Sequence, residues 1–104
     1  MTAVYGKLIR DNIPEIIIKQ GKTPIIRTLS RDEYIYHLKI KLLEEVNEYI
    51  TCSNIEEICD IYEVIDAIKK TEGYLDADIE AVKTAKAIKN GKFDKRLFLE
   101  KVEV

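Results

Sequence analysis

A regular spacing of apolar residues predicts a long amphipathic helix in the first half of the chain. It opens at Ser30, because Ser30 and Glu33 form a capping-box pattern in which each side chain can bond the other residue's backbone N–H. Apolar positions then recur every three or four residues and so share one face. They are Ile35, Leu38, Leu42, Val46 and Tyr49. We expect this helix to run to about Ile50.

A second long helix follows after a short break. The segment Thr51 to Asn54 interrupts the pattern, and Asn54 or Ser53 can cap a helix from Ile55 to about Lys70. Its apolar stripe has the same helical spacing and consists of Ile58, Ile61, Val64, Ile65 and Ile68. So short a connection makes the two helices antiparallel neighbours.

Two more helices are expected outside this pair. Pro14 suits the first turn of a short helix that Asp11 or Asn12 can cap and that Gly21 ends. A third long helix should start near Asp76 and stop at Asn90-Gly91.

Two remaining segments favour strands. Pro24–Leu29 is β-branched and bounded by Pro and Ser, and the tail from Arg96 to Val104 alternates in its last part. The two segments could pair. The predicted fold class is therefore mainly α, an antiparallel helical bundle with a small β-ribbon made by the N- and C-terminal segments. A chain of 104 residues should form one domain over residues 1–104.

The charge of the chain is unevenly distributed. The net charge is -2, from 17 basic and 19 acidic residues, yet the window from Glu44 to Asp66 holds eight acids and no Lys or Arg. The remainder carries 17 bases and 11 acids, a net charge of +6. The slight overall acidity argues against a nucleic-acid binder that works by phosphate neutralisation. A nucleotide held through a metal remains compatible with it.

The composition also limits the location of the protein. No apolar run approaches the roughly 20 residues that span a bilayer, and no signal-sequence pattern is present. Cys52 and Cys59 lie among apolar neighbours without a CxxC pattern, which predicts two reduced thiols in the core. We therefore expect a cytoplasmic protein without a membrane partner.

Four of the acids lie at or near the apolar stripes. Glu45 borders the first stripe with Glu48 one step further out, Glu57 projects into the second stripe, and Asp60 lies beside it. Burying an unpaired carboxylate costs several kcal/mol, so Glu57 needs a cation, a proton or a hydrogen-bond partner. Facing pairs at i, i+3 on antiparallel helices would form an all-oxygen site suited to Mg²⁺ or Mn²⁺.

Two other interpretations of these acids compete with a metal site of this kind. A solvated acidic face is an equally open interpretation of the set as a whole, and it is the preferred one for Glu63 and Asp66, which lie further from the stripe. A di-iron bundle needs Glu-x-x-His twice, and His37 is the only histidine of the chain.

The acids and the two ends of the chain resemble a known family. Glu44-Glu45-Val46-Asn47-Glu48 followed by Glu57-Ile58-Cys59-Asp60 resembles the EExxE…ExxD signature of the MazG superfamily of all-α NTP pyrophosphohydrolases, to which phosphoribosyl-ATP pyrophosphohydrolase is related. The stretch Tyr5–Ile17 resembles the YNKLVRDKIPEII opening of a small branch of predicted house-cleaning enzymes. The closing segment from Lys86 to Leu99 is similar to that branch as well.

The resemblance implies a chemistry and a set of residue roles. It implies Mg²⁺-dependent hydrolysis of a nucleoside triphosphate between the α and β phosphates, with NMP and pyrophosphate as products. The implied metal ligands are Glu45, Glu48, Glu57 and Asp60. Glu44 would orient the ligands or act as the water base, and Lys7, Arg10 and Lys86 would bind phosphates.

Two alternative functions stay open. In the first, the enzyme hydrolyses phosphoribosyl-ATP with the same carboxylates. In the second, the protein is a non-catalytic helical module whose acidic face docks a basic partner. The family resemblance also implies a homodimer or a higher homo-oligomer with a shared site.

Overall fold

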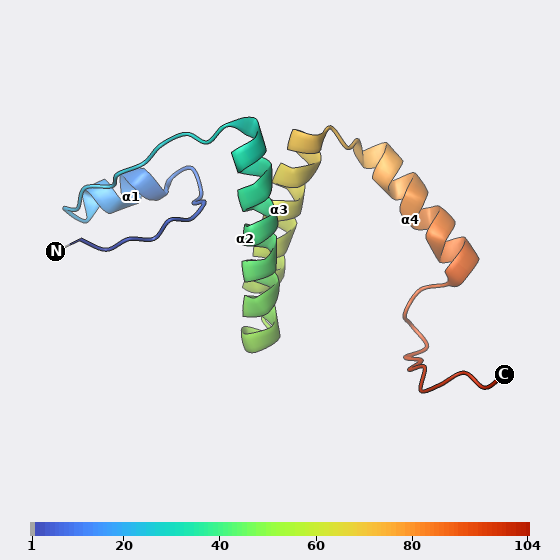
Figure 1. Cartoon of the computed structure of the whole chain (residues 1–104). Helices are drawn as coiled ribbons and strands as arrows, with labels where there is room; N and C mark the ends of the chain where they lie inside the picture. Colours follow the sequence, from blue (N-terminus) through green and yellow to red (C-terminus); the bar gives the residue numbers. More distant parts are fainter. Residues whose placement is uncertain (1) are drawn as a thin grey trace. The chain divides into compact units, whose positions relative to one another are not determined.

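The structure is a computed structural model that describes residues 2–104, and its secondary structure is helical (Figure 1). The helices are α1 (Ile13–Lys19), α2 (Arg31–Cys52), α3 (Ile55–Glu72) and α4 (Asp76–Asn90). The chain divides into two compact units, Met1–Glu72 and Gly73–Val104, and each is described by itself. The mainly α class is confirmed, whereas a single domain over residues 1–104 stays a prediction.

The start of α2 has the predicted capping box. Ser30 Oγ accepts a hydrogen bond from the Glu33 N–H at 3.3 Å, and Glu33 Oε1 accepts one from the Ser30 N–H at 3.2 Å. Arg27 adds an ion pair, with its Nη2 2.7 Å from Glu33 Oε2. These contacts lower the pKa of Glu33 from 4.5 to about 2, the Arg27 hydrogen bond being the largest cause. The first turn of α2 is thus fixed by its own sequence.

A tight turn connects α2 to α3. Ser53 ends α2 in the left-handed region at φ 48°, and its N–H bonds the Tyr49 carbonyl. Asn54 caps α3, because its Oδ1 accepts a hydrogen bond from the Glu57 N–H at 3.1 Å. At the far end of the pair, Arg31 Nη2 donates to the Thr71 carbonyl at 3.2 Å. The start of α2 therefore lies beside the end of α3, as antiparallel helices require.

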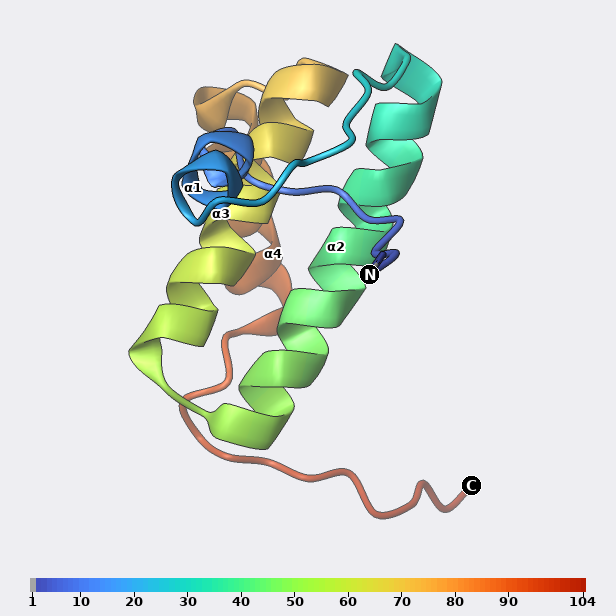
Figure 2. The same cartoon turned by 90° about the vertical axis from the view of Figure 1, so that its left-hand side faces the viewer.

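Helices α2 and α3 are the pair that packs together within the described residues (Figure 2). Leu38 from α2 and Val64 from α3 are buried, and the other residues of both predicted stripes are half-buried except Tyr49 and Ile65 at the edge. The predicted stripes thus face each other. We name this pair of helices the α2–α3 hairpin.

The N-terminal segment lies against both helices of the hairpin. Lys7 Nζ is 3.8 Å from Glu44 Oε1 on α2, and Arg10 Nη2 is 2.7 Å from Asp60 Oδ1 on α3. Figure 2 shows this segment passing across both helices. It then enters α1, where Pro14 sits in the first turn as predicted, although the Asn12 side chain makes no capping hydrogen bond.

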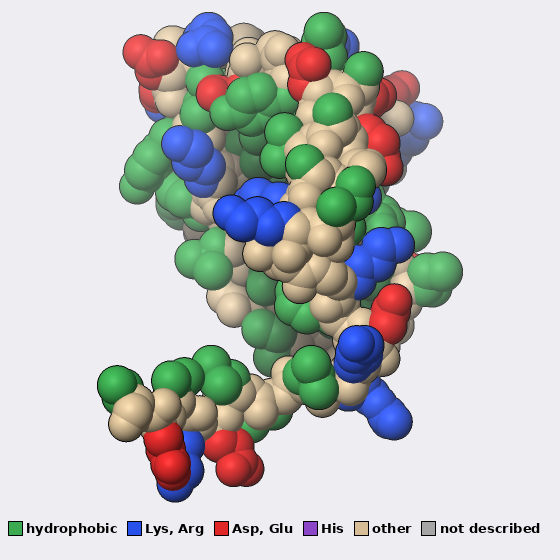
Figure 3. All heavy atoms as spheres, turned by 90° about the vertical axis from the view of Figure 1, so that its right-hand side faces the viewer, with side chains coloured by type: hydrophobic (Ala, Val, Ile, Leu, Met, Phe, Trp, Pro, Cys, Tyr) green, Lys and Arg blue, Asp and Glu red, His purple; other side chains and the backbone are tan. Residues whose placement is uncertain are grey.

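The second unit holds α4 and the C-terminal segment. Helix α4 has acids in its first turn and Lys89 in its last, as the helix dipole favours. Figure 3 shows hydrophobic side chains on one edge of the C-terminal segment and charged ones on the other. The alternation noted in the sequence is therefore present in space.

The β-ribbon prediction is wrong for residues 2–104, which contain no strand. Ile25 and Phe98, from the two proposed strands, are 92% and 87% exposed. A strand needs a partner for its backbone N–H and C=O groups, and β-branched composition alone does not supply one. The segment before α2 is instead held to the first turn of α2 through Arg27.

Two smaller expectations have separate outcomes. Within the unit Met1–Glu72, α2 and α3 pack as a hairpin, and the full helical bundle stays a prediction. Cys52 and Cys59 are both unpaired, but they are exposed and do not lie in a core. No helix in the described part of the chain is long and apolar enough to cross a membrane.

Candidate metal centre

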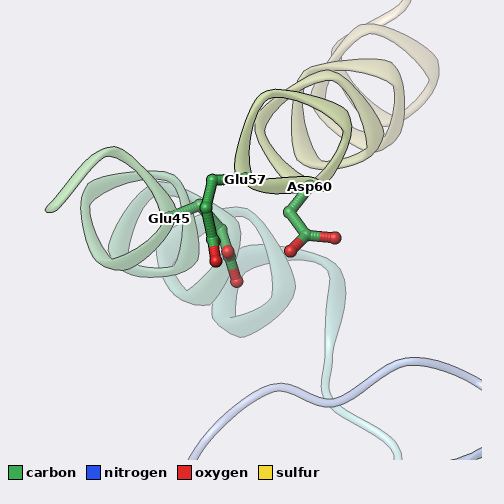
Figure 4. Close-up of side chains that lie close together, drawn as sticks. All are labelled: Glu45, Glu57 and Asp60. Carbon is green, nitrogen blue, oxygen red and sulfur yellow. The ribbon is translucent and has the colours of Figure 1, made fainter. Parts of the chain in front are cut away.

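Three carboxylates from the two helices of the hairpin lie close together (Figure 4). Glu45 comes from α2, and Glu57 and Asp60 come from α3. One oxygen of each lies within 4.8 Å of the other two. Oxygens this close together repel one another as anions unless a proton or a cation lies between them.

Helical geometry and the short turn together produce this meeting. Glu57 and Asp60 are three residues apart and project from one side of α3. The antiparallel pairing then brings Glu45 of α2 opposite Glu57. The approach predicted from the spacing is therefore confirmed for Glu45, Glu57 and Asp60.

Two oxygens of the cluster are buried without a partner. Glu45 is only 6% exposed, and its Oε2 has no hydrogen-bond partner among the described residues. Glu57 is half-buried, and its Oε2 is shielded from solvent and unpartnered in the same way. A buried polar atom without a partner is destabilising. These two oxygens are the feature that separates this cluster from an ordinary acidic surface.

The pKa values of both glutamates reflect this environment. Burial raises the pKa of Glu45 above 4.5, and the negative charge of Glu48 raises it further, while Lys41 opposes the rise. Burial is also the largest cause that raises the pKa of Glu57. A side-chain hydrogen bond with Glu48 and the negative charge of Glu48 raise it further. The cluster thus makes the charged forms of Glu45 and Glu57 less favourable than they are in water.

Lys41 is a cation that was not expected beside the cluster. Its Nζ lies 3.5 Å from Glu44 Oε1 and 3.5 Å from Glu45 Oε1. It precedes the acidic window but stands at i−4 from Glu45, a spacing that brings side chains together on a helix. The i, i+4 rule could have found it. It neutralises one oxygen of Glu45 and leaves Oε2 unpartnered.

The structure places the other predicted ligands and acids differently. Glu48 is exposed and lies outside the three-oxygen cluster, although its charge acts on Glu45 and Glu57. Glu44 is half-buried and lies between Lys41 and Lys7. It is adjacent to the cluster along α2 but not part of it.

The predicted phosphate-binding cations divide into two groups. Lys7 and Arg10 lie beside the acids of the hairpin and contact Glu44 and Asp60. No spacing rule could have found the Arg10–Asp60 pair, since the two residues are 50 positions apart. Lys86 lies exposed on α4 in the other unit, and its role stays a prediction.

The donor set determines which ligand this cluster suits. Three carboxylates offer only oxygen, which hard cations such as Mg²⁺ and Mn²⁺ prefer and which soft metals do not. A divalent cation would give the unpartnered oxygens of Glu45 and Glu57 a partner. The residues therefore fit a divalent metal, and they form an acidic cluster on two helices of a helical protein.

Comparisons with known proteins leave the family open. No family model matches the chain, and no solved structure matches it. An uncharacterized protein of Mycolicibacterium smegmatis is 60% identical over 43 residues, which cover 41% of this chain and 44% of that protein. The match thus spans less than half of that relative.

Proposed function

We propose that this protein is a Mg²⁺-dependent nucleoside triphosphate pyrophosphohydrolase of the MazG-like all-α type, with Mn²⁺ as an alternative metal. It would cleave between the α and β phosphates and release NMP and pyrophosphate, in the house-cleaning of non-canonical nucleotides. One observation carries the proposal: Glu45 Oε2 is buried and unpartnered beside the oxygens of Glu57 and Asp60. The sequence resemblance of both acidic half-motifs gives this cluster its chemistry.

The residues of the hairpin divide the work between them. Glu45, Glu57 and Asp60 hold the metal, and the exposed Glu48 joins them by a change of rotamer. A bound Mg²⁺ supplies the positive charge that stabilises a triphosphate during phosphoryl transfer and makes water a stronger acid. Glu44, next to Glu45 on α2, orients the attacking water and accepts its proton.

Basic residues bind the phosphates in this proposal. Lys7 and Arg10 already lie at the edge of the acids, within 3.8 Å of Glu44 and 2.7 Å of Asp60. Arginine offers a planar fork to phosphate oxygens and lysine a point charge. Lys86 of α4 is the third cation, which we assign from the sequence resemblance alone.

Assembly into a homodimer or higher homo-oligomer is part of the proposal. About 120° around the helix from its core stripe, α2 carries a second stripe, spaced 4-3-4-3, whose apolar members are exposed. They are Tyr36, Ile40, Leu43, Asn47 and Ile50. This spacing is the one by which helices pack in coiled coils, and a single Asn often sets their register. A second copy on this stripe would complete a helical bundle.

The assembly has its own test. Leu43 is 62% exposed and central to the second stripe, so Leu43→Asp should turn an oligomer into a monomer. Glu80→Gln on α4 is the control. Sedimentation of the wild type as a monomer at micromolar concentration would overturn the assembly and leave the metal site untouched.

The unpaired Cys52 and Cys59 support placing the protein in the reducing cytoplasm.

Two rival functions remain alternatives to this one. Phosphoribosyl-ATP as substrate would use the same cluster with another pocket wall. A non-catalytic module would dock a basic partner on the acidic face, and such a face needs no buried unpartnered carboxylate. The burial of Glu45 Oε2 favours the metal enzyme over the docking module.

The deciding experiment is a pyrophosphate-release assay. Ordinary and damaged nucleoside triphosphates and phosphoribosyl-ATP are tested with Mg²⁺, and then with Mn²⁺. We expect release from at least one triphosphate, and loss of that release in Glu45→Gln. Inactivity on every substrate overturns the enzyme proposal, and activity on phosphoribosyl-ATP alone selects the first alternative.

A further inference from the structure

The N-terminal segment places a cation on the rim of the acidic cluster. Arg10 Nη2 donates a hydrogen bond to Asp60 Oδ1 at 2.7 Å. Asp60 is the more open member of the cluster, with a side chain 37% exposed against 8% for Glu45. Arg10 thus approaches from the solvent side and reaches Asp60.

The contact with Arg10 does not satisfy the interior of the cluster. The guanidinium contacts one oxygen of Asp60, while Oε2 of both Glu45 and Glu57 stays without a hydrogen bond. An arginine is too broad to enter among three oxygens that lie within 4.8 Å of one another, whereas a divalent ion is not. Arg10 and a divalent ion would therefore both contact Asp60, but only the divalent ion would also reach the buried oxygens of Glu45 and Glu57.

The segment that carries Arg10 is held at both ends. Half-buried Leu8 and Ile9 lie between Lys7, which contacts Glu44, and Arg10, which contacts Asp60. After release of Asp60, the Lys7–Glu44 contact and the half-buried Leu8 and Ile9 would still hold the segment, so that the Arg10 side chain stays within reach of the site. Its side chain is 59% exposed, which leaves room for it to turn toward a ligand.

We propose that Arg10 is an exchangeable counter-cation of the metal site. It pairs with Asp60 while the cluster holds no metal, gives up this carboxylate when a divalent cation binds, and then donates to phosphate oxygens of the nucleotide. Because the role of Asp60 as a ligand is itself proposed, this inference rests on the proposed function. It adds that one residue opposes metal binding and favours nucleotide binding.

The inference predicts two effects of opposite sign for Arg10→Gln. Loss of an exposed ion pair should tighten Mn²⁺ binding in the absence of nucleotide by about two- to fivefold. Loss of a charge-assisted contact to phosphate should weaken binding of a non-hydrolysable triphosphate, with saturating Mn²⁺, by about tenfold or more. A residue that only stabilises the fold would weaken both.

Calorimetric titration with Mn²⁺ alone tests the first effect. Arg31→Gln is the matched control, because it removes the same charge from the same unit but lies fourteen residues before Glu45, about 20 Å along α2. Arg10→Lys keeps the charge, and serves if Arg10→Gln does not fold as judged by circular dichroism. We expect Arg10→Lys to stay near wild type for Mn²⁺ and to lose part of the triphosphate affinity.

The outcomes separate this inference from the proposed function. If Mn²⁺ binds the wild type, is lost in Glu57→Gln and binds Arg10→Gln no more tightly than wild type, the counter-cation role is overturned and the metal site stands. An equal gain in Arg31→Gln also overturns it, since the effect is then one of net charge. Absence of Mn²⁺ binding to the wild type overturns the metal site and this inference together.

Discussion

Helix α3 carries the same motif twice, and the two copies have different surroundings. Glu57 and Asp60 are half-buried against α2, whereas Glu63 and Asp66 are exposed. Asp66 pairs with Lys69 at 3.6 Å, and its side chain is 65% exposed. The copies are six residues apart, which turns the second by roughly 240° around the helix.

The difference between the copies shows what makes an acidic pair a candidate site. Both copies have the same ligand atoms and the same i, i+3 spacing. Only the first copy faces a third carboxylate, Glu45, in a place where water cannot satisfy every oxygen. The face of the helix, and not the motif, therefore decides which pair is the candidate metal site.

The largest expected effect separates the two copies by activity. Glu57→Gln should lower kcat/KM for pyrophosphate release by more than about a hundredfold, because it removes a proposed metal ligand without changing the shape of the side chain. The matched change Glu63→Gln should stay within about twofold of wild type. Steady-state kinetics at saturating Mg²⁺ measure both. Equal losses in the two variants would mean that the inner copy has no special role.

The helices of this protein follow closely from its sequence. The capping box at Ser30 and the break at Ser53–Asn54 are local signals, so the bounds of α2 and α3 differ from the expected ones by about two residues. The expected strands failed because their pairing depends on a distant partner. The local sequence pattern does not determine whether a distant segment pairs with the strand.

The candidate site was predictable only in part. Rotation along a helix places Glu57 and Asp60 together, and the short turn brings Glu45 to them. Arg10 comes from 50 residues away and follows no periodicity. Spacing groups Glu48 with the candidate ligands, yet its rotamer leaves it exposed, and rotamers of surface residues are not set by sequence pattern.

The second expected effect is on stability with metal. Metal bound to the native state alone adds about 2.7 kcal/mol to the free energy of unfolding at a hundred times its Kd. We expect millimolar Mn²⁺ to raise the Tm of wild type and of Glu63→Gln, and not that of Glu45→Gln. Thermal scans followed by circular dichroism measure this. A similar rise in Glu45→Gln would place the bound ion elsewhere.

A smaller effect concerns pH in the metal-free protein. The folded state raises the pKa of Glu45 and Glu57 and so takes up protons before the unfolded chain does. Stability therefore rises as pH falls from above the raised pKa values toward 4.5. Glu33 has the opposite sign: its pKa of about 2 means that its stabilisation is lost as pH falls from 4.5 toward 2.

Two variants test which residues cause each part of this dependence of stability on pH. Glu45→Gln combined with Glu57→Gln should remove the gain between neutral pH and 4.5, and Glu33→Gln should reduce the loss below 4.5. Urea unfolding at a series of pH values measures both. A wild-type stability that falls steadily from pH 7 would contradict the raised pKa values.

The smallest expected effect tests the outer copy by itself. Asp66→Asn removes an exposed ion pair with Lys69, and such pairs contribute about 0.2–1 kcal/mol. Raising the salt concentration should shrink the difference between wild type and variant, because exposed pairs are screened. Urea unfolding at low and high salt measures this. A loss that is large and insensitive to salt would mean that Asp66 is buried in the functional assembly, and the outer copy would then be an interface and not a solvated face.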